Sequence, residues 1–450
     1  MRDAESLVTS SLWVALARVL ALVAFIPTNF ILARLLGTRD FGRFAVIASV
    51  VVFAGYCATL GTNRMLLRDI AANRARGTWD DLARSQRTSS VVLMASIPAA
   101  GIITATIGLV VFRSWIMPAF GLALALAFLT GANALQTVAG DVLRGFGDIR
   151  VASFVEGRNG GVIQSLVFLV CLIPFIGHEL TLLVALELYL AAFVIMLVPV
   201  SVRLRRLWLG TYVNSSTRVE APRHQNGLRD FLLPSLALGS IQLGALLGSQ
   251  IDLWIGGAAL QPRAVSIFAG AARIMLIVGT PLAAVGVVVT PRLAALHARG
   301  HRAELERFAR QAATLVVAPS LLVIIPILLF AGDTMRIFLG NGFGSGGRVL
   351  LWLTVGQLIA ALTGVCGQLL AMTGHERDVV RVAYGILTAK LLIGFPVAFR
   401  FGVSGLAAVS SLTTAVTAVV LVAFAHKRLD VWTYPSFERG IFSLRRFRRL

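Results

Sequence analysis

The sequence predicts an all-α polytopic membrane protein with about twelve transmembrane helices in two parallel six-helix lobes. Of its 450 residues, 57% are hydrophobic and only 14% are charged, which is more apolar surface than soluble domains bury. The apolar stretches recur at the length of about 20 residues that a helix needs to cross a bilayer. An internal repeat then divides these stretches into two halves related by a pseudo-two-fold axis along the membrane normal.

The apolar stretches come six before residue 202 and six after residue 230. The first is too long for the core of a signal peptide, so it is interpreted as a retained membrane helix. The predicted spans are 12–34, 43–65, 88–112, 117–139, 153–176, 181–201, 231–258, 264–290, 311–332, 349–373, 379–398 and 403–425.

The basic residues predict the orientation. Alternate connections are rich in arginine, as in the segments 68–87, 203–229 and 292–310, whereas the opposite connections hold few basic residues. By the positive-inside rule the arginine-rich side is cytoplasmic, so both termini are predicted to be inside. The net charge of +20 is then a topology signal that also attracts anionic lipids, and it does not indicate nucleic-acid binding.

Two short segments repeat at a shift of about half the chain. "ARGTWDDLARSQR" (75–87) returns as "ARGHRAELERFAR" (298–310), and "LRGFGDIR" (143–150) has a looser echo in "LAMTGHER" (370–377). Each half has an even number of helices, so the copies point the same way, as in two-lobed transporters with a site between the lobes. The predicted domains are a first lobe (1–201), a cytoplasmic inter-lobe linker (202–230), a second lobe (231–426) and a basic cytoplasmic tail (427–450).

Cationic side chains inside the spans are candidate binding residues, because each costs free energy in hydrocarbon. Arg18 and Arg273 come one from each lobe, and Asn29, which shares a helix face with Arg18, is a further candidate for binding the anionic headgroup. Two guanidinium groups at one cleft would form a receptor for phosphate oxygens. Lys390 lies near mid-span, as Arg273 does. The alternatives are snorkelling to the inner surface for Arg18, and a structural ion pair for Arg273 and Lys390.

Three acidic residues are candidates for a coupling or counter-ion role. Asp252 and Glu187 lie in the outer thirds of their helices, where each is either the counter-ion of a lobe arginine or a proton or sodium site. Glu156 lies at an inner helix edge, and an interfacial position is its alternative reading. No cofactor is predicted beyond a coupling ion, H⁺ or Na⁺.

The sequence gives little support for nucleotide hydrolysis, cysteine chemistry or metal binding. No P-loop motif occurs, and the three cysteines show no ligand spacing. His297, His301 and Glu304 have the spacing of metal ligands, but they lie on an arginine-rich amphipathic stretch, which is typical of a solvated face. The sequence therefore predicts neither an enzyme nor a metal protein.

Several segments resemble the bacterial polysaccharide flippases, the oligosaccharide-lipid exporters of the multidrug/oligosaccharidyl-lipid/polysaccharide (MOP) superfamily. They include "ILARLLGTRDFGRFAVIAS", "SQIDLWIGG", "VSIFAGAARIMLIVGTPLAAVGVVVTPRLAAL" and "LRGFGDIR". The related lipid II flippases direct arginines of the first and eighth helices toward a cationic cavity, and "ARVLA" (17–21) and "AARIM" (271–275) place Arg18 and Arg273 at the matching positions. The resemblance implies that both arginines receive the pyrophosphate of a polyprenyl-linked glycan. The two extra C-terminal helices of lipid II flippases have no counterpart here, so export of the peptidoglycan precursor is not expected.

The predicted function is a flippase of the bacterial plasma (inner) membrane. It would move polyprenyl-diphosphate-linked oligosaccharide to the outer leaflet by alternating access, for polysaccharide export or cell-envelope glycan synthesis. Its expected partners are that substrate, membrane lipids, and a glycan polymerase or glycosyltransferases of the same pathway. The alternatives are a multidrug/cation antiporter of the same superfamily, a membrane-embedded glycan polymerase or glycosyltransferase, and a non-transporting scaffold. The basic mid-span residues disfavour the antiporter, and the short outer connections disfavour the enzyme.

Overall fold

The computed structural model describes residues 2–112, 119–155, 161–215 and 228–435, and these ranges contain helices and no strand. Packing divides the chain into two compact units, residues 1–257 and 258–450. This division places residues 231–257, which the sequence assigns to the second lobe, in the first unit, and it does not set apart the predicted linker or tail. The predicted domain boundaries stay a prediction, because they follow the repeat and not the packing.

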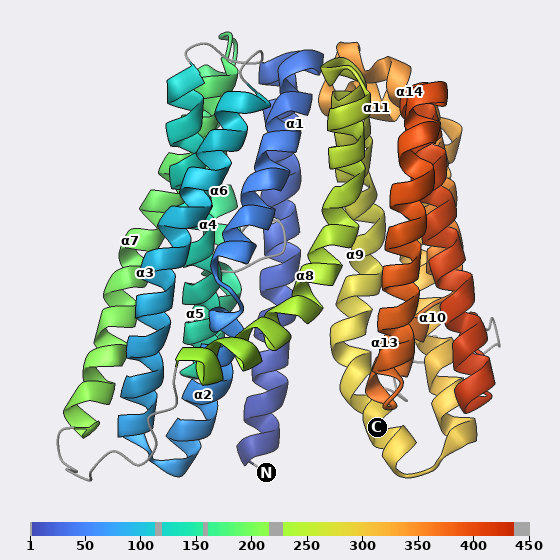
Figure 1. Ribbon diagram of the computed structural model, residues 1–450. Helices are drawn as coiled ribbons and strands as arrows, with labels where there is room; N and C mark the ends of the chain where they lie inside the picture. The colour runs from blue at the N-terminus through green and yellow to red at the C-terminus, as the bar shows by residue number, and fades with distance from the viewer. Residues whose placement is uncertain (1, 113–118, 156–160, 216–227, 436–450) are drawn as a thin grey trace. The chain divides into compact units, whose positions relative to one another are not determined.

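The first unit is built around α4 (Figure 1). This helix contacts α1, α3 and α7, and its buried Leu122, Leu126 and Leu129 share one face. A Cβ atom at Gly101 of α3 would lie 3.4 Å from the carbonyl oxygen of Ala127, so glycine lets α3 approach α4 closely. The unit comprises α1 (Arg2–Ala58), α2 (Thr62–Arg76), α3 (Trp79–Val110), α4 (Ala119–Gly145), α5 (Ile149–Val155), α6 (Val162–Leu172), the short 3-10 helix η1 (Ile173–Phe175), α7 (Leu182–Ser215) and nearly all of α8 (Leu228–Ala259).

The second unit is built in the same way around α12. This helix packs against α9, α10 and α14, and Leu350 and Thr354 on it are fully buried. The unit comprises α9 (Pro262–Ala298), α10 (Arg302–Leu329), α11 (Ala331–Leu339), the 3-10 helix η2 (Asn341–Gly346), α12 (Gly347–Leu362), α13 (Cys366–Met372) and α14 (Glu376–Leu429).

Both of the longest helices are interrupted at a glycine. Gly37 in α1 has φ 69° and Gly402 in α14 has φ 66°, in the left-handed region that favours glycine. Each helix therefore consists of two helical segments. The breaks fall between the predicted spans 12–34 and 43–65 and between 379–398 and 403–425, which confirms both separations.

Three predicted spans run more than two residues past a break between observed helices. The span 43–65 runs past the end of α1, because Leu60 (φ 48°) and Gly61 (φ 75°) form a left-handed turn before α2. The span 349–373 is divided into α12 and α13 at Gly364 (φ 67°). The span 153–176 begins in α5, and α6 starts only at Val162. Hydropathy does not register a left-handed turn inside an apolar stretch, which explains the first two differences.

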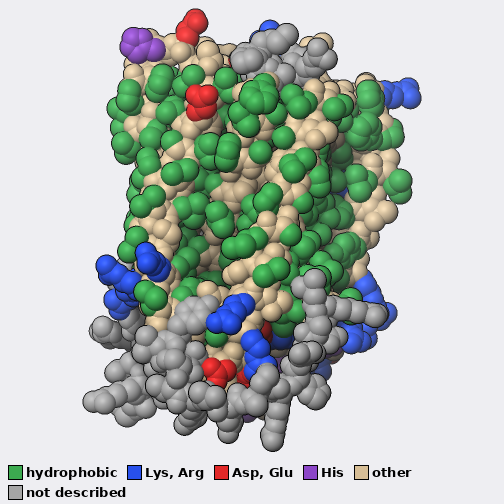
Figure 2. All heavy atoms as spheres, turned by 60° about the vertical axis from the view of Figure 1, so that its left-hand side comes forward, with side chains coloured by type: hydrophobic (Ala, Val, Ile, Leu, Met, Phe, Trp, Pro, Cys, Tyr) green, Lys and Arg blue, Asp and Glu red, His purple; other side chains and the backbone are tan. Residues whose placement is uncertain are grey.

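The described helices fit a multi-pass membrane protein. Eight of them are long and apolar enough to cross a bilayer, or nine if the two halves of α8 count as one bent span. This count takes α1 and α14 as one helix each. On the face shown in Figure 2, hydrophobic side chains cover a broad band, and most of the visible Lys and Arg side chains gather at one end. The predicted total of twelve spans and the orientation of the termini stay predictions.

The two halves of the repeat share the geometry of their helix ends. In the first copy the N–H of Thr78 donates to the carbonyl of Asn73 five residues earlier, and Gly77 before it has φ 72°. In the second copy the N–H of His301 donates to the carbonyl of Leu296, and Gly300 before it has the same φ. The looser echo has the same geometry: the N–H of Asp148 donates to the carbonyl of Leu143, and the N–H of His375 donates to the carbonyl of Leu370. All four ends are thus Schellman motifs closed by a left-handed glycine, which supports the internal repeat.

The connections predicted to be cytoplasmic lie together at one end of each unit, here called the inner end. In the first unit Arg74 donates to the carbonyl of Phe146, and Arg203 pairs with Asp148 at 2.9 Å. In the second unit Arg302 donates to the carbonyl of Asp430, and Arg428 pairs with Asp378 at 3.0 Å. The alternation of basic and non-basic connections therefore has a spatial counterpart in both units.

Candidate functional site

The two predicted anion-binding arginines lie in different units. Arg18 is in the first segment of α1, and its side chain lies outside the described residues, as does Glu156. Arg273 is in α9 with its side chain half-buried. It stands 11 residues after Pro262, or about 16 Å along the helix axis. Arg273 is thus well inside a candidate span, whereas its pairing with Arg18 stays a prediction.

Lys390 lies inside the second unit. Its side chain is only 8% exposed, and Nζ donates a hydrogen bond of 3.5 Å to Oγ of Ser410. The two residues stand on the two segments of α14 that meet at Gly402. A buried ammonium group is costly in hydrocarbon unless it has partners, and the Ser410 hydroxyl is one of them. Whether Lys390 also meets cargo stays a prediction.

Asn29 is buried and bonds within its own helix. Its Nδ2 donates to the carbonyl of Phe25 at 2.8 Å, and the neighbouring Thr28 donates to Ala24 at 2.7 Å and to Ser165 of α6 at 3.2 Å. These contacts give Asn29 a local structural role beside its predicted one.

The two described acidic candidates differ in exposure. Glu187 is exposed and stands fewer than two turns after the start of α7. Asp252 is half-buried in α8, two residues before Trp254, whose ring nitrogen donates to Oγ of Ser49 at 3.0 Å. Only Asp252 therefore has the partly buried position that an ion-coupling carboxylate needs.

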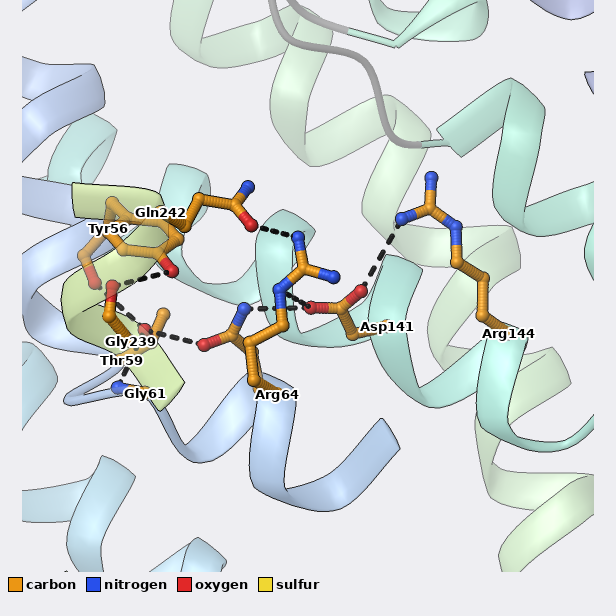
Figure 3. Close-up of polar contacts among 9 residues, drawn as sticks. Tyr56, Thr59, Gly61, Arg64, Asp141, Arg144, Gly239 and Gln242 are labelled. Atoms are coloured by element: carbon orange, nitrogen blue, oxygen red, sulfur yellow. Dashed lines mark hydrogen bonds and ion pairs between the residues drawn. The ribbon is translucent and has the colours of Figure 1, made fainter. Parts of the chain in front are cut away.

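A buried charged cluster at the inner end of the first unit was not predicted (Figure 3). Asp141 of α4 is fully buried; its Oδ2 accepts a hydrogen bond of 2.7 Å from Asn63 and lies 3.5 Å from Nε of Arg64. Its Oδ1 lies 3.4 Å from Nη1 of Arg144. The side chains of Arg64 and Arg144 are 27% and 34% exposed, so the two cations are partly exposed whereas the carboxylate is enclosed.

The same cluster continues to α8. A nitrogen of Arg64 donates to the side-chain oxygen of Gln242, and the Tyr56 hydroxyl donates to the carbonyl of Gly239 at 3.4 Å. A Cβ atom at Gly239 would lie 2.9 Å from Cα of Gly61. The turn between α1 and α2 and the first half of α8 therefore touch backbone to backbone.

Sequence patterns gave little sign of this cluster. Asp141 lies just beyond the predicted span 117–139, and Asn63 and Asp141 are 78 residues apart. Only the spacing of three residues between Asp141 and Arg144 is a local signal, since it brings the two side chains to one helix face.

Comparison with known proteins identifies the family. The family model described as "Polysaccharide biosynthesis protein" matches residues 7–297. The chain belongs to this family. A comparison with curated protein sequences gave no match.

Solved structures similar to this family member are membrane transporters. An inward-facing multidrug resistance MATE transporter of the MOP superfamily is 18% identical, with a TM-score of 0.66 over 91% of this chain and 94% of that one. The lipid II flippase MurJ in an inward closed conformation is 11% identical, with a TM-score of 0.65 over 93% and 87%. A Pyrococcus furiosus MOP transporter, described as having a binding pocket of reverse polarity, is 18% identical, with a TM-score of 0.50 over 94% and 95%. At these identities the likeness shows the fold.

The described residues of this family member offer no grouping for a metal. Within them, no set of three or more His, Cys, Asp and Glu side chains is placed to hold an ion. His301 instead lies 3.4 Å from Glu304 on an exposed stretch of α10. Within the described residues, Arg273 and Lys390 are cations inside candidate spans, and the charge-paired cluster around Asp141 lies at the inner end of the first unit.

Proposed function

We propose that this protein is a flippase for polyprenyl-diphosphate-linked oligosaccharide in the bacterial plasma membrane, acting in polysaccharide export or cell-envelope glycan synthesis. The observation that carries the proposal is the family match over residues 7–297, which includes Arg18 and Arg273. A lipid II flippase has the same fold, so the fold is consistent with this cargo class.

In this proposal the diphosphate is the group that the protein must carry through the membrane. The headgroup enters from the cytoplasm and pairs with Arg18 and Arg273, because a guanidinium group binds phosphate oxygens in a planar fork. The polyprenyl tail stays in the bilayer. Lys390 adds a second cation in the half of the chain that carries Arg273.

Release of the cargo needs a competitor for the arginines. Asp252 is the better candidate, because it is half-buried in α8, whereas Glu187 is exposed. Once deprotonated or freed from a sodium ion, a carboxylate would compete with phosphate for a guanidinium group. Coupling to H⁺ or Na⁺ would act through that competition.

The nearest second candidate is a multidrug/cation antiporter. The TM-score of 0.66 with a MATE transporter favours it as much as the score of 0.65 with MurJ favours a flippase. The charges separate the two functions, since a cationic drug requires acidic groups, whereas Arg273 and Lys390 are basic residues within spans. For the Pyrococcus furiosus transporter, the reverse polarity of the binding pocket is described as suggesting a different function.

The test is transport by the purified protein in proteoliposomes. A fluorescent polyprenyl-diphosphate oligosaccharide should move between leaflets, and ethidium uptake should stay at the level of empty vesicles. Arg273→Ala should slow lipid movement about tenfold or more, while Arg263→Ala, at an exposed arginine at the start of α9, should leave it unchanged. Ethidium transport without lipid movement would overturn the proposal in favour of the antiporter.

A further inference from the structure

The internal repeat assigns the first segment of α8 to the C-terminal half of the chain, whereas its packing places it in the first unit. A shift of 223 residues aligns Arg76 with Arg299 in the repeated segment, and the same shift aligns 231–258 with 8–35. By this alignment α8 is the first helix of the second half. The structure nevertheless packs its first part on the inner end of the first unit.

The contact is close and made largely by small residues. A Cβ atom at Gly61 would overlap the carbonyl oxygen of Ser235, and one at Gly239 would lie 3.2 Å from the nitrogen of Gly61. Around this contact Met65 and Phe231 form an apolar cluster that Leu238 also joins. Helix backbones that meet at glycine gain packing energy without interlocking long side chains.

The hydrogen bonds across the contact can break without leaving a buried charge unpaired. On the α8 side the acceptors are neutral, namely the side chain of Gln242 and the carbonyl of Gly239. On the other side, Arg64 keeps Asp141 as its ion partner, and Asp141 keeps Asn63. Separation would therefore exchange hydrogen bonds to neutral acceptors for bonds to water and leave the pair of Arg64 with the buried Asp141 intact, which avoids the large cost of an uncompensated buried charge.

The helix itself is bent where the contact ends. The segments Phe231–Gly244 and Leu246–Ala259 differ in direction by 55°. A sharp bend disturbs backbone hydrogen bonds, which in a membrane must be satisfied by neighbours. The first segment contacts the turn at Gly61, so the bent helix and this contact occur together in the conformation described.

We propose that residues 231–244 of α8 form a latch, which binds the turn at Leu60–Gly61 in one state of the transport cycle and releases it in the other. The inference rests on the proposed transport activity. Asp141 is a positioning residue in this device, because it holds Arg64 toward Gln242 from within the first unit.

The test uses a steric wedge with a matched control on the same helix. Gly239→Leu inserts a side chain into the contact, whereas Gly248→Leu places the same side chain where no atom lies within 4 Å. The reporter is Ser235→Cys, at a fully buried position, in a background with Cys57, Cys171 and Cys366 replaced by alanine. N-ethylmaleimide labelling in native membranes reads latch opening, and complementation of a flippase-deficient strain reads transport.

The latch predicts slow, partial labelling of Ser235→Cys in the parent. Gly239→Leu should raise the labelling rate several-fold and abolish complementation, while Gly248→Leu should leave both unchanged. Gln242→Leu should act in the same direction as Gly239→Leu but more weakly, with Gln250→Leu as its control.

Two results would overturn the latch. One is full complementation by Gly239→Leu. The other is a labelling rate of Ser235→Cys that neither Gly239→Leu nor Gln242→Leu changes. Labelling does not depend on which cargo is carried. If the parent protein does not flip glycolipid but Gly239→Leu still raises the labelling rate, the proposed cargo is wrong and the latch is retained.

Discussion

Asn63 donates a hydrogen bond of 2.7 Å to Asp141, and this contact joins the start of α2 to the central helix of the first unit. The acceptor is a fully buried carboxylate with an arginine on either side. Removal of the carboxylate would leave two guanidinium groups near one another without their shared counter-ion.

Asp141→Ala should therefore destabilise the protein by about 2–3 kcal/mol, because hydrogen bonds and ion pairs to a buried charge are lost together. Chemical unfolding in detergent micelles measures the effect. The matched control is Asp148→Ala, which removes the more exposed pair with Arg203 and should cost less than about 1 kcal/mol. Equal losses in the two variants would contradict a special role for the buried cluster.

The Schellman motifs predict equal effects at equivalent glycines. Gly77 and Gly300 both have φ 72°, and neither has an atom within 4 Å of a Cβ position, so alanine would meet only backbone strain. Gly77→Ala and Gly300→Ala should each destabilise by about 1 kcal/mol. Gly210→Ala and Gly385→Ala, within helices and in open space, should instead be neutral or stabilising. A loss at only one of the first two positions would argue against structural equivalence of the halves.

Much of the fold could be predicted from the sequence. The apolar stretches and the positions of charge gave the membrane class and most helices, and the repeated "ARG" segments located equivalent helix ends. Breaks at Gly61 and Gly364 escaped prediction, because hydropathy averages over a turn that only two dihedral angles define.

The candidate site was predictable in part. Arg273 and Lys390 stood out, because a charge inside an apolar stretch is visible in sequence. The pairing of Asn63 and Arg64 with Asp141 was not, because it joins separate helices at the edge of predicted spans. The contact of Gly61 with Gly239 was equally hidden, since glycine in an apolar helix gives no direction of packing.

Lys390 allows a test of cargo binding within the second unit. Lys390→Met keeps the length of the side chain and removes its charge, so stability should change by less than about 1 kcal/mol while transport falls about tenfold. Ser410→Ala removes the hydroxyl that lies 3.5 Å from Nζ and keeps the charge, and it should retain transport. The two variants are compared in unfolding and lipid-flipping assays. Normal flipping by Lys390→Met would remove Lys390 from the proposed site.

The most direct measurement of the central claim is glycolipid flipping in proteoliposomes by Arg18→Ala, Arg273→Ala and the double variant. If both guanidinium groups hold the diphosphate, each single variant should lose about tenfold or more in rate at low cargo concentration, because a charge-assisted hydrogen bond to phosphate is lost. Arg→Lys variants should recover part of the rate, since lysine keeps the charge without the fork. Unchanged flipping by both alanine variants, with cargo still moved by the parent protein, would contradict the account.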